Sequence, residues 1–213
     1  MWNFKQRAFQ AALLGVCVAA FAFAPQVARA GEVTINACTA GGFNAQTPGS
    51  TNSLLGLTYT SSCFNVTTFG GFAALGPGSL GSFSLDTSAN NYNGNTFALD
   101  LTFTIPTGIS GGSSATFTAT LVGAVSNSAT GGVFINFDNT PQVFNFSNPD
   151  AVGTFTLMVN DISVSPGGTG SVTGNITNAE NNPVVVPEPA SFLLLGTGIG
   201  IGGLFLRRRK RFA

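Results

Sequence analysis

The feature that most constrains the fold of this 213-residue chain is a strict alternation of apolar and polar residues from position 97 to position 105. Phe97, Leu99, Leu101, Phe103 and Ile105 alternate with alanine, aspartate and threonine. Because successive side chains of a β-strand point to opposite faces, this period of two predicts a strand that buries all five apolar residues on one face. An α-helix would need a period near 3.6, and the segment between the two chain ends shows no convincing one.

The same alternation recurs in several other short segments. They contain Ala115, Phe117, Ala119 and Leu121; Val133, Ile135 and Phe137; Phe144 and Phe146; Phe155, Leu157 and Val159; and, more weakly, Val172 and Ile176. Glycine-rich turn signals such as Asn93-Gly94 and Gly111-Gly112 separate them. The sequence therefore predicts an all-β fold, an antiparallel β-sandwich on a phenylalanine core, in a jelly-roll or an immunoglobulin-like arrangement.

Lysine and arginine occur only near the two ends of the chain. Lys5, Arg7 and Arg29 lie near the N-terminus, and the other five form the basic cluster Arg207, Arg208, Arg209, Lys210 and Arg211. All eight acids lie between Arg29 and Arg207, so that segment has a formal charge of 0 − 8 = −8. It cannot form an internal salt bridge, and it cannot hold phosphate, nucleic acid or an anionic polysaccharide by charge.

The composition also removes most catalytic chemistry. The chain has no histidine and its central segment has no lysine, which excludes Ser-His-Asp, Cys-His and Ser-Lys arrangements and makes a zinc site improbable. A carboxylate-dependent hydrolase is the enzyme hypothesis that survives, but a sugar-binding cleft usually offers aromatic platforms, and this segment has no tryptophan and only Tyr59 and Tyr92. Leu85-Asp86-Thr87-Ser88 is similar to an aspartic-protease turn but lacks its glycine and a second copy, so we interpret it as a strand end. We therefore predict a protein that is not an enzyme.

The N-terminus predicts an exported protein. Lys5 and Arg7 precede an apolar run from Ala11 to Ala24, and Ala28-Arg29-Ala30 has the A-x-A pattern of a signal peptidase site. We expect residues 1–30 to be a helical signal peptide that is cleaved after Ala30.

The C-terminus combines three unlike elements in a fixed order. Pro187, Glu188 and Pro189 precede an apolar run over residues 190–206, and the basic cluster follows. An apolar helix of this length covers roughly 25 Å, and with snorkelling arginines it can span a bilayer. The basic cluster would hold that end in the cytoplasm and leave the rest of the chain outside. A plain C-terminal membrane anchor is the alternative interpretation.

This order of elements resembles the PEP-CTERM sorting signal of exopolysaccharide-producing Gram-negative bacteria, over Val186 to Ala213. The resemblance implies processing by the membrane peptidase exosortase, with a precursor anchored in the inner membrane and a final place at the cell surface or in the extracellular matrix. It implies a structural or adhesive role in exopolysaccharide or biofilm. We accordingly divide the chain into a signal peptide (1–30), a β-sandwich domain (31–177), a linker (178–186) and the sorting signal (187–211).

Cys38 and Cys63 are the two cysteines left after signal removal. An oxidising compartment favours a disulfide between them, across a loop that includes Gly41-Gly42, and such a bridge would contribute about 3 kcal/mol. Two reduced, buried thiols are the alternative.

Two ligand classes are compatible with this composition. Asp138 with Asn139, and Asn148, Asp150, Asn160 and Asp161, could supply oxygen ligands to Ca²⁺, although Asx-turns explain such residues more often. Rows of threonine on the polar strand faces could hydrogen-bond to a polysaccharide, although threonine is also simply a good strand former. A carbohydrate-binding, lectin-like module is therefore the alternative to a structural role.

Overall fold

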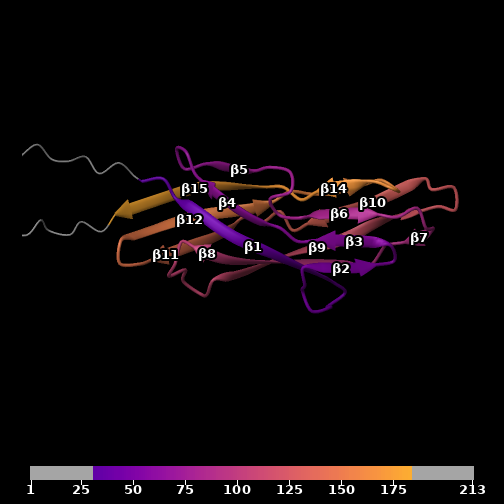
Figure 1. The fold of residues 1–213 in the computed structure, drawn as a ribbon, viewed down its shortest axis with the longest axis horizontal. Helices are drawn as coiled ribbons and strands as arrows, with labels where there is room; N and C mark the ends of the chain where they lie inside the picture. The colour runs from indigo at the N-terminus through magenta and orange to yellow at the C-terminus, as the bar shows by residue number, and fades with distance from the viewer. Residues whose placement is uncertain (1–30, 184–213) are drawn as a thin grey trace, which may run out of the picture. The chain divides into compact units, whose positions relative to one another are not determined.

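The described part of the chain, residues 31–183 of a computed structural model, consists of β-strands joined by turns (Figure 1). The strands are β1 (Thr34–Phe43), β2 (Thr51–Leu54), β3 (Leu57–Thr60), β4 (Cys63–Thr67), β5 (Ala73–Leu75), β6 (Ser82–Leu85), β7 (Asn90–Asn91), β8 (Thr96–Ile105), β9 (Ser114–Val125), β10 (Gly131–Phe137), β11 (Gln142–Ser147), β12 (Ala151–Val159), β13 (Ile162–Val164), β14 (Thr169–Ser171) and β15 (Gly174–Pro183). The predicted all-β class is confirmed for these residues. The predicted signal helix and transmembrane helix lie outside them, and residues 31–183 include no helix long and apolar enough to cross a membrane.

The strands form three antiparallel sheets. The large sheet has the order β13-β10-β9-β8-β1-β4, and the short strand β7 pairs with the C-terminal end of β9. One four-stranded sheet has the order β11-β12-β15-β5, and the other has the order β14-β6-β3-β2. The antiparallel pairing agrees with the sequence prediction, and the choice between a jelly-roll and an immunoglobulin-like arrangement stays a prediction.

The two smaller sheets cover the inner face of the large sheet side by side. Phe97 of β8 packs on Phe83 of β6 with ring centroids 4.9 Å apart, and on Tyr59 of β3 at 5.0 Å. Six residues further along β8, Phe103 packs on Phe144 of β11 at 4.9 Å and on Phe155 of β12 at 5.5 Å. The core is thus a layer of aromatic rings between the large sheet and both small ones, as the sequence predicts.

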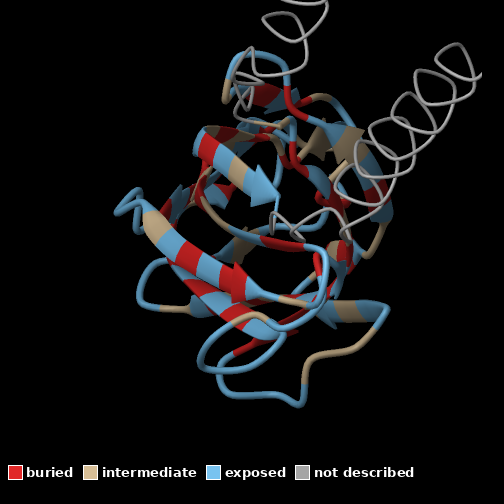
Figure 2. Ribbon diagram, turned by 90° about the vertical axis from the view of Figure 1, so that its left-hand side faces the viewer, coloured by how far each residue is buried: buried red, intermediate tan, exposed pale blue. Residues whose placement is uncertain are grey.

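Buried and exposed residues alternate along the long strands (Figure 2). Four of the five apolar residues predicted to share one face of β8 are buried, but Ile105 is 43% exposed, so that part of the prediction is wrong. The register explains this: Ala37 of β1 pairs with Phe103, whereas the preceding Asn36 pairs with Ile105. Thr104 is therefore an extra residue in β8, and such a bulge turns the next side chain to the opposite face.

The domain extends further than predicted at its C-terminal end. β15 runs to Pro183, so the prediction of a linker over residues 178–186 is wrong for 178–183; residues 184–186 lie outside the described part. Glu180 pairs with Thr154 of β12 and Pro183 with Ala151, because backbone pairing does not require apolar side chains. Gly31 forms an isolated bridge with Asn181, which places the first and last described residues at the same end of the domain.

Candidate functional site

The residues predicted to direct export and sorting lie outside the described part of the chain. They are Ala28 and Ala30 at the signal cleavage site, Pro187, Glu188 and Pro189 of the sorting motif, and the basic cluster Arg207–Arg211. The structure of residues 31–183 therefore does not bear on these predicted signals.

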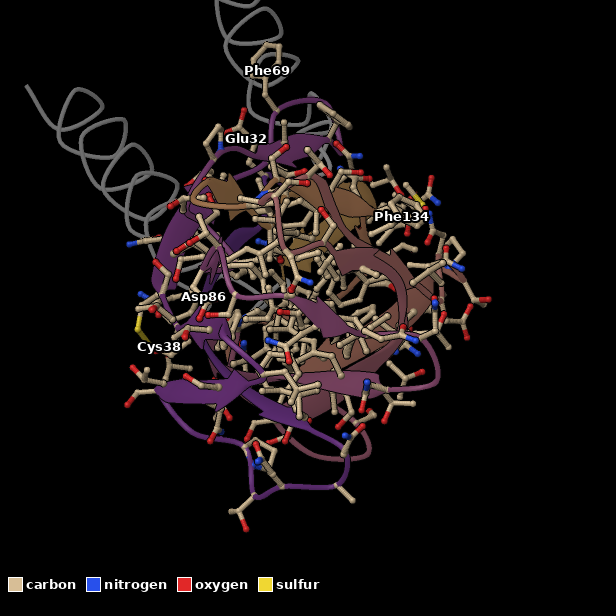
Figure 3. The ribbon with its side chains drawn as sticks, turned by 90° about the vertical axis from the view of Figure 1, so that its right-hand side faces the viewer. Glu32, Cys38, Phe69, Asp86 and Phe134 are labelled. Atoms are coloured by element: carbon tan, nitrogen blue, oxygen red, sulfur yellow. A yellow bond between two sulfur atoms is a disulfide. The ribbon has the colours of Figure 1, made fainter. Side chains whose placement is uncertain are left out.

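The structure forms the predicted disulfide between Cys38 and Cys63. The two cysteines are directly opposite each other on β1 and β4, at the edge of the large sheet, and both are exposed. Figure 3 labels Cys38 at the surface of the domain. The enclosed segment is not the loop that the sequence analysis expected, because it contains β2, β3 and the end of β1. The bridge therefore ties two neighbouring strands and leaves no free thiol on residues 31–183.

A hollow of about 440 Å³ lies on the outer face of the large sheet. Its polar lining residues are Thr96 of β8, Thr118 and Thr120 of β9, and Asn136 and Asp138 at the end of β10. Hydroxyl groups, one amide and one carboxylate can hydrogen-bond to a neutral polar ligand, and the segment between Arg29 and Arg207 provides no lysine or arginine to bind an anion.

A small apolar patch adjoins this hollow on the same face. Phe134 of β10 is 39% exposed and pairs with Val122 of β9, which is 49% exposed. Each lies two residues along its strand from a lining residue, Asn136 and Thr120 respectively. An aromatic ring beside hydroxyls and an amide is a surface on which a sugar ring can lie.

Two smaller hollows lie at the end of the domain where Gly31 meets β15. Glu32 and Asp150 line one of about 300 Å³, and Glu32 and Glu180 line the other, of about 330 Å³. The side chain of Asn181 donates a hydrogen bond of 3.4 Å to the Glu32 carbonyl and helps to hold this arrangement. These acid pairs could not be predicted from the sequence, because Glu32 and Glu180 come together only through the pairing of distant segments.

Asp86, considered for hydrolytic chemistry, and Asp138, considered as a calcium ligand, both accept hydrogen bonds from neighbouring residues. Asp86 accepts hydrogen bonds from the Ser88 N–H at 2.9 Å and its hydroxyl at 3.2 Å, which confirms the strand-end interpretation of that motif. Asp138 accepts from the Thr140 hydroxyl at 2.6 Å and N–H at 3.1 Å, and these bonds lower the pKa of Asp138 below its usual value. Asp138 lines the hollow of about 440 Å³ and Asp86 lines none of the three hollows described, so the two share none of them.

The residues considered as calcium ligands fall into two separate groups. Asp161 accepts from the Phe137 N–H at 2.8 Å, and the Asn139 amide, when turned to donate, reaches Asp161 at 3.0 Å. Asn148 instead accepts from the backbone N–H groups of Asp150 and Ala151, which is an Asx-turn. Within residues 31–183 no three acidic or cysteine side chains gather as a metal site would need, and calcium binding stays a prediction.

Neither tyrosine is available as a binding platform, because both are buried. The Tyr59 hydroxyl lies 2.8 Å from Thr39 Oγ1 and 2.9 Å from the Leu80 carbonyl oxygen, and burial raises the pKa of Tyr59 to about 12. Among residues 31–183, the large exposed aromatic side chains are instead Phe69, Phe72 and Phe134. Sequence reasoning treated phenylalanine as core, and the Gly70-Gly71 pair between Phe69 and Phe72 is the signal that could have marked these two as a turn.

Comparison with known proteins assigns the C-terminal segment. A family model described as the PEP-CTERM protein-sorting motif matches residues 185–210, which confirms the resemblance found in the sequence. No curated protein and no solved structure matches the chain. The chain thus carries a membrane-anchoring sorting signal and is an exported protein sorted by exosortase.

Proposed function

We propose that the mature domain is a non-enzymatic structural or adhesive component of the exopolysaccharide matrix at the cell surface. The observation that carries this proposal is the combination of the sorting motif with an exported domain that has no cation and a hydroxyl-rich outer sheet face.

The outer face of the large sheet supports this role chemically. Thr102, Thr116, Thr118 and Thr120 are exposed on β8 and β9, and Asp100 accepts a hydrogen bond of 2.6 Å from the Thr116 hydroxyl. Such a face stays hydrated while carrying little charge, so it can hydrogen-bond to neutral glycans. Anionic polymers are repelled, because no lysine or arginine offsets the acids.

The second candidate is a carbohydrate-binding module, and the hollow beside Phe134 is the observation in its favour. In this interpretation a sugar ring packs on Phe134, while Thr118, Thr120 and Asn136 provide the hydrogen bonds. One ring and a shallow hollow give weak binding per site, which suits a protein that holds a matrix by many contacts.

Sorting is tested in a strain that has exosortase. Glu188→Ala should leave the protein as an unprocessed, membrane-held form, because the peptidase is expected to recognise the Pro-Glu-Pro motif. Glu180→Ala is the matched control, since it removes an exposed acid of β15 outside the motif. Mass spectrometry of surface material decides the question: residues 207–213 still attached to the wild-type protein would contradict processing.

Ligand binding is tested on a glycan array with the purified exported protein, with and without calcium. We expect salt-tolerant binding to neutral glycans that Asn136→Ala and Thr118→Val weaken and that Thr169→Val, an exposed threonine of β14, does not. Binding confined to anionic polymers would contradict the proposal. Hydrolysis of a glycan that is lost in Glu32→Gln with Asp150→Asn would replace it by a hydrolase.

A further inference from the structure

The hairpin between β4 and β5 exposes two phenylalanines side by side. Phe69 and Phe72 form an isolated bridge, with backbone hydrogen bonds of 2.8 and 3.2 Å, so their side chains share one face of the hairpin. Gly70 and Gly71 complete the turn with φ of 59° and 80°. A two-residue turn with both φ values positive strongly favours glycine, and it places the two phenylalanines opposite each other.

The exposure of these two side chains is unusual in a domain that buries most of its aromatic rings. Phe69 is 83% exposed and Phe72 is 50% exposed, and Phe69 has the highest exposed fraction among the large apolar residues of 31–183. In Figure 3 Phe69 points away from the body of the domain. Single exposed apolar residues are ordinary, but a pair on a rigid turn forms a small apolar surface.

The hairpin lies at the end of the domain from which the chain leaves toward the sorting motif. The Ala179 N–H of β15 donates to the Gly71 carbonyl at 3.1 Å, and β15 ends four residues later at Pro183. Gly70 and Gly71 line the same hollow as Glu32 and Glu180. Figure 3 shows Phe69 and Glu32 at the same end, with Phe134 elsewhere on the domain.

The chain outside the described domain limits how far this end can be from the membrane. Residues 184–189 separate Pro183 from the apolar run that begins at Ala190. Six fully extended residues reach at most about 20 Å. While the sorting signal is anchored, the exit of β15 therefore stays within that reach of the bilayer, and the tether raises the effective concentration of the hairpin at the lipid surface.

We propose that Phe69 and Phe72 insert into the interfacial layer of the bilayer and hold the uncut precursor's domain against the membrane. Phenylalanine suits this layer because proteins that lie on a bilayer bury Phe, Trp and Leu side chains at the boundary between headgroups and acyl chains. Glu32 and Glu180 flank the hairpin and no lysine or arginine lies between Arg29 and Arg207 to offset them, so we expect the hairpin to bind a zwitterionic lipid surface better than an anionic one. Cleavage of the tail removes the tether. Two phenylalanine rings alone bind too weakly to hold the domain at the membrane, so the domain is released.

The test uses the full chain, purified from membranes of a host without exosortase and reconstituted in phosphatidylcholine vesicles. In a Trp2→Phe background, Phe69→Trp makes the introduced tryptophan the sole one in the chain. We expect a blue-shifted emission and loss of fluorescence with brominated phosphatidylcholine. The matched control is Phe134→Trp in the same background, another aromatic substitution at an exposed ring, which should show neither effect.

Three further measurements make the result decisive. Adding Phe72→Ser to Phe69→Trp should reduce the quenching, and replacing part of the lipid with phosphatidylglycerol should also reduce it. Circular dichroism confirms that each variant remains folded. If the Phe69→Trp protein is folded and its emission is neither shifted nor quenched, the proposal is wrong. The hairpin would then either remain in water or bind a protein partner. Glycan binding does not enter this assay, so its outcome is independent of the proposed matrix role.

Discussion

Placing a charge on either face of β8 tests the architecture directly. Leu101 is fully buried between Thr39 of β1 and Ala115 of β9, so Leu101→Asp removes a core side chain and buries a carboxylate. Loss of the leucine costs about 2–5 kcal/mol. Burial of an unpaired carboxylate adds several kcal/mol, because no lysine, arginine or histidine lies between Arg29 and Arg207 to pair with it. The sum is comparable to the entire stability of an ordinary domain, about 5–15 kcal/mol, so we expect unfolding at neutral pH.

The neighbouring residue provides the control. Thr102 is exposed on the opposite face of the same strand, so Thr102→Asp places its charge in water and should change stability by less than about 1 kcal/mol. Asp100 lies two residues away on the same face, and its carboxylate would repel one introduced at position 102. Thr102→Asn changes the side chain without adding a charge, so it separates this repulsion from the effect of the substitution itself.

Urea denaturation followed by circular dichroism measures both effects on the purified exported protein. The penalty of Leu101→Asp should shrink in mildly acidic buffer, because burial raises the pKa of the introduced carboxyl and its neutral form is then the one buried. Equal loss of stability in Leu101→Asp and Thr102→Asp would refute the reasoning, since it would mean that β8 does not separate a buried face from a hydrated one.

Two further predictions concern groups outside β8. Cys63→Ala should lower the unfolding free energy by about 2–5 kcal/mol, and a free thiol found by titration of denatured wild-type protein would contradict the bridge. Tyr59 keeps its proton up to a pKa of about 12 in the folded domain against 10.0 when unfolded, so its stabilising contribution is complete below pH 10 and is lost as pH rises toward 12. Tyr59→Phe should remove that alkaline step from the pH dependence of the denaturation midpoint, and an unchanged step would assign it to another group.

The strands with uninterrupted alternation could be predicted from sequence because burial on one face is a local pattern. Phe117 and Leu121 of β9 and Ile135 of β10 are buried as expected. Ile105 could not be predicted, because the bulge that turns it outward depends on how β1 pairs with β8. Local pattern thus gives the face of a strand but not its irregularities.

Two segments that look like loops are strands for reasons that lie elsewhere in the chain. A Cβ atom on Gly41 would come within 2.5 Å of ring atoms of Phe97 and Tyr59, so this glycine makes room for the aromatic core while remaining in β1. The end of β15 is rich in asparagine and its alternation is broken at Asn178, where φ is 51°. Its pairing partners on β12 decide its structure, and they are distant in sequence.

The functional features also differ in whether they could be predicted from the sequence. The sorting signal could be found from sequence because its three elements are contiguous, and the chemistry excluded by missing residue types needed no coordinates. The hollow beside Phe134 and the acids that meet at Glu32 could not, because each is assembled from segments that only strand pairing brings together. The Phe69–Phe72 hairpin is local, and its sequence signal is the Gly70-Gly71 pair.

The position of β15 in its sheet sets the order of events during secretion. β15 lies between β12 and β5, so both of those strands have an unpaired edge until residues 174–183 arrive. A chain that crosses the membrane from its N-terminus delivers these ten residues last, immediately before the sorting segment. Folding therefore finishes only when the chain is almost fully across, and a polypeptide truncated at Thr173 would present two open, aggregation-prone edges. Completion of the fold thus requires the residues that directly precede the sorting segment.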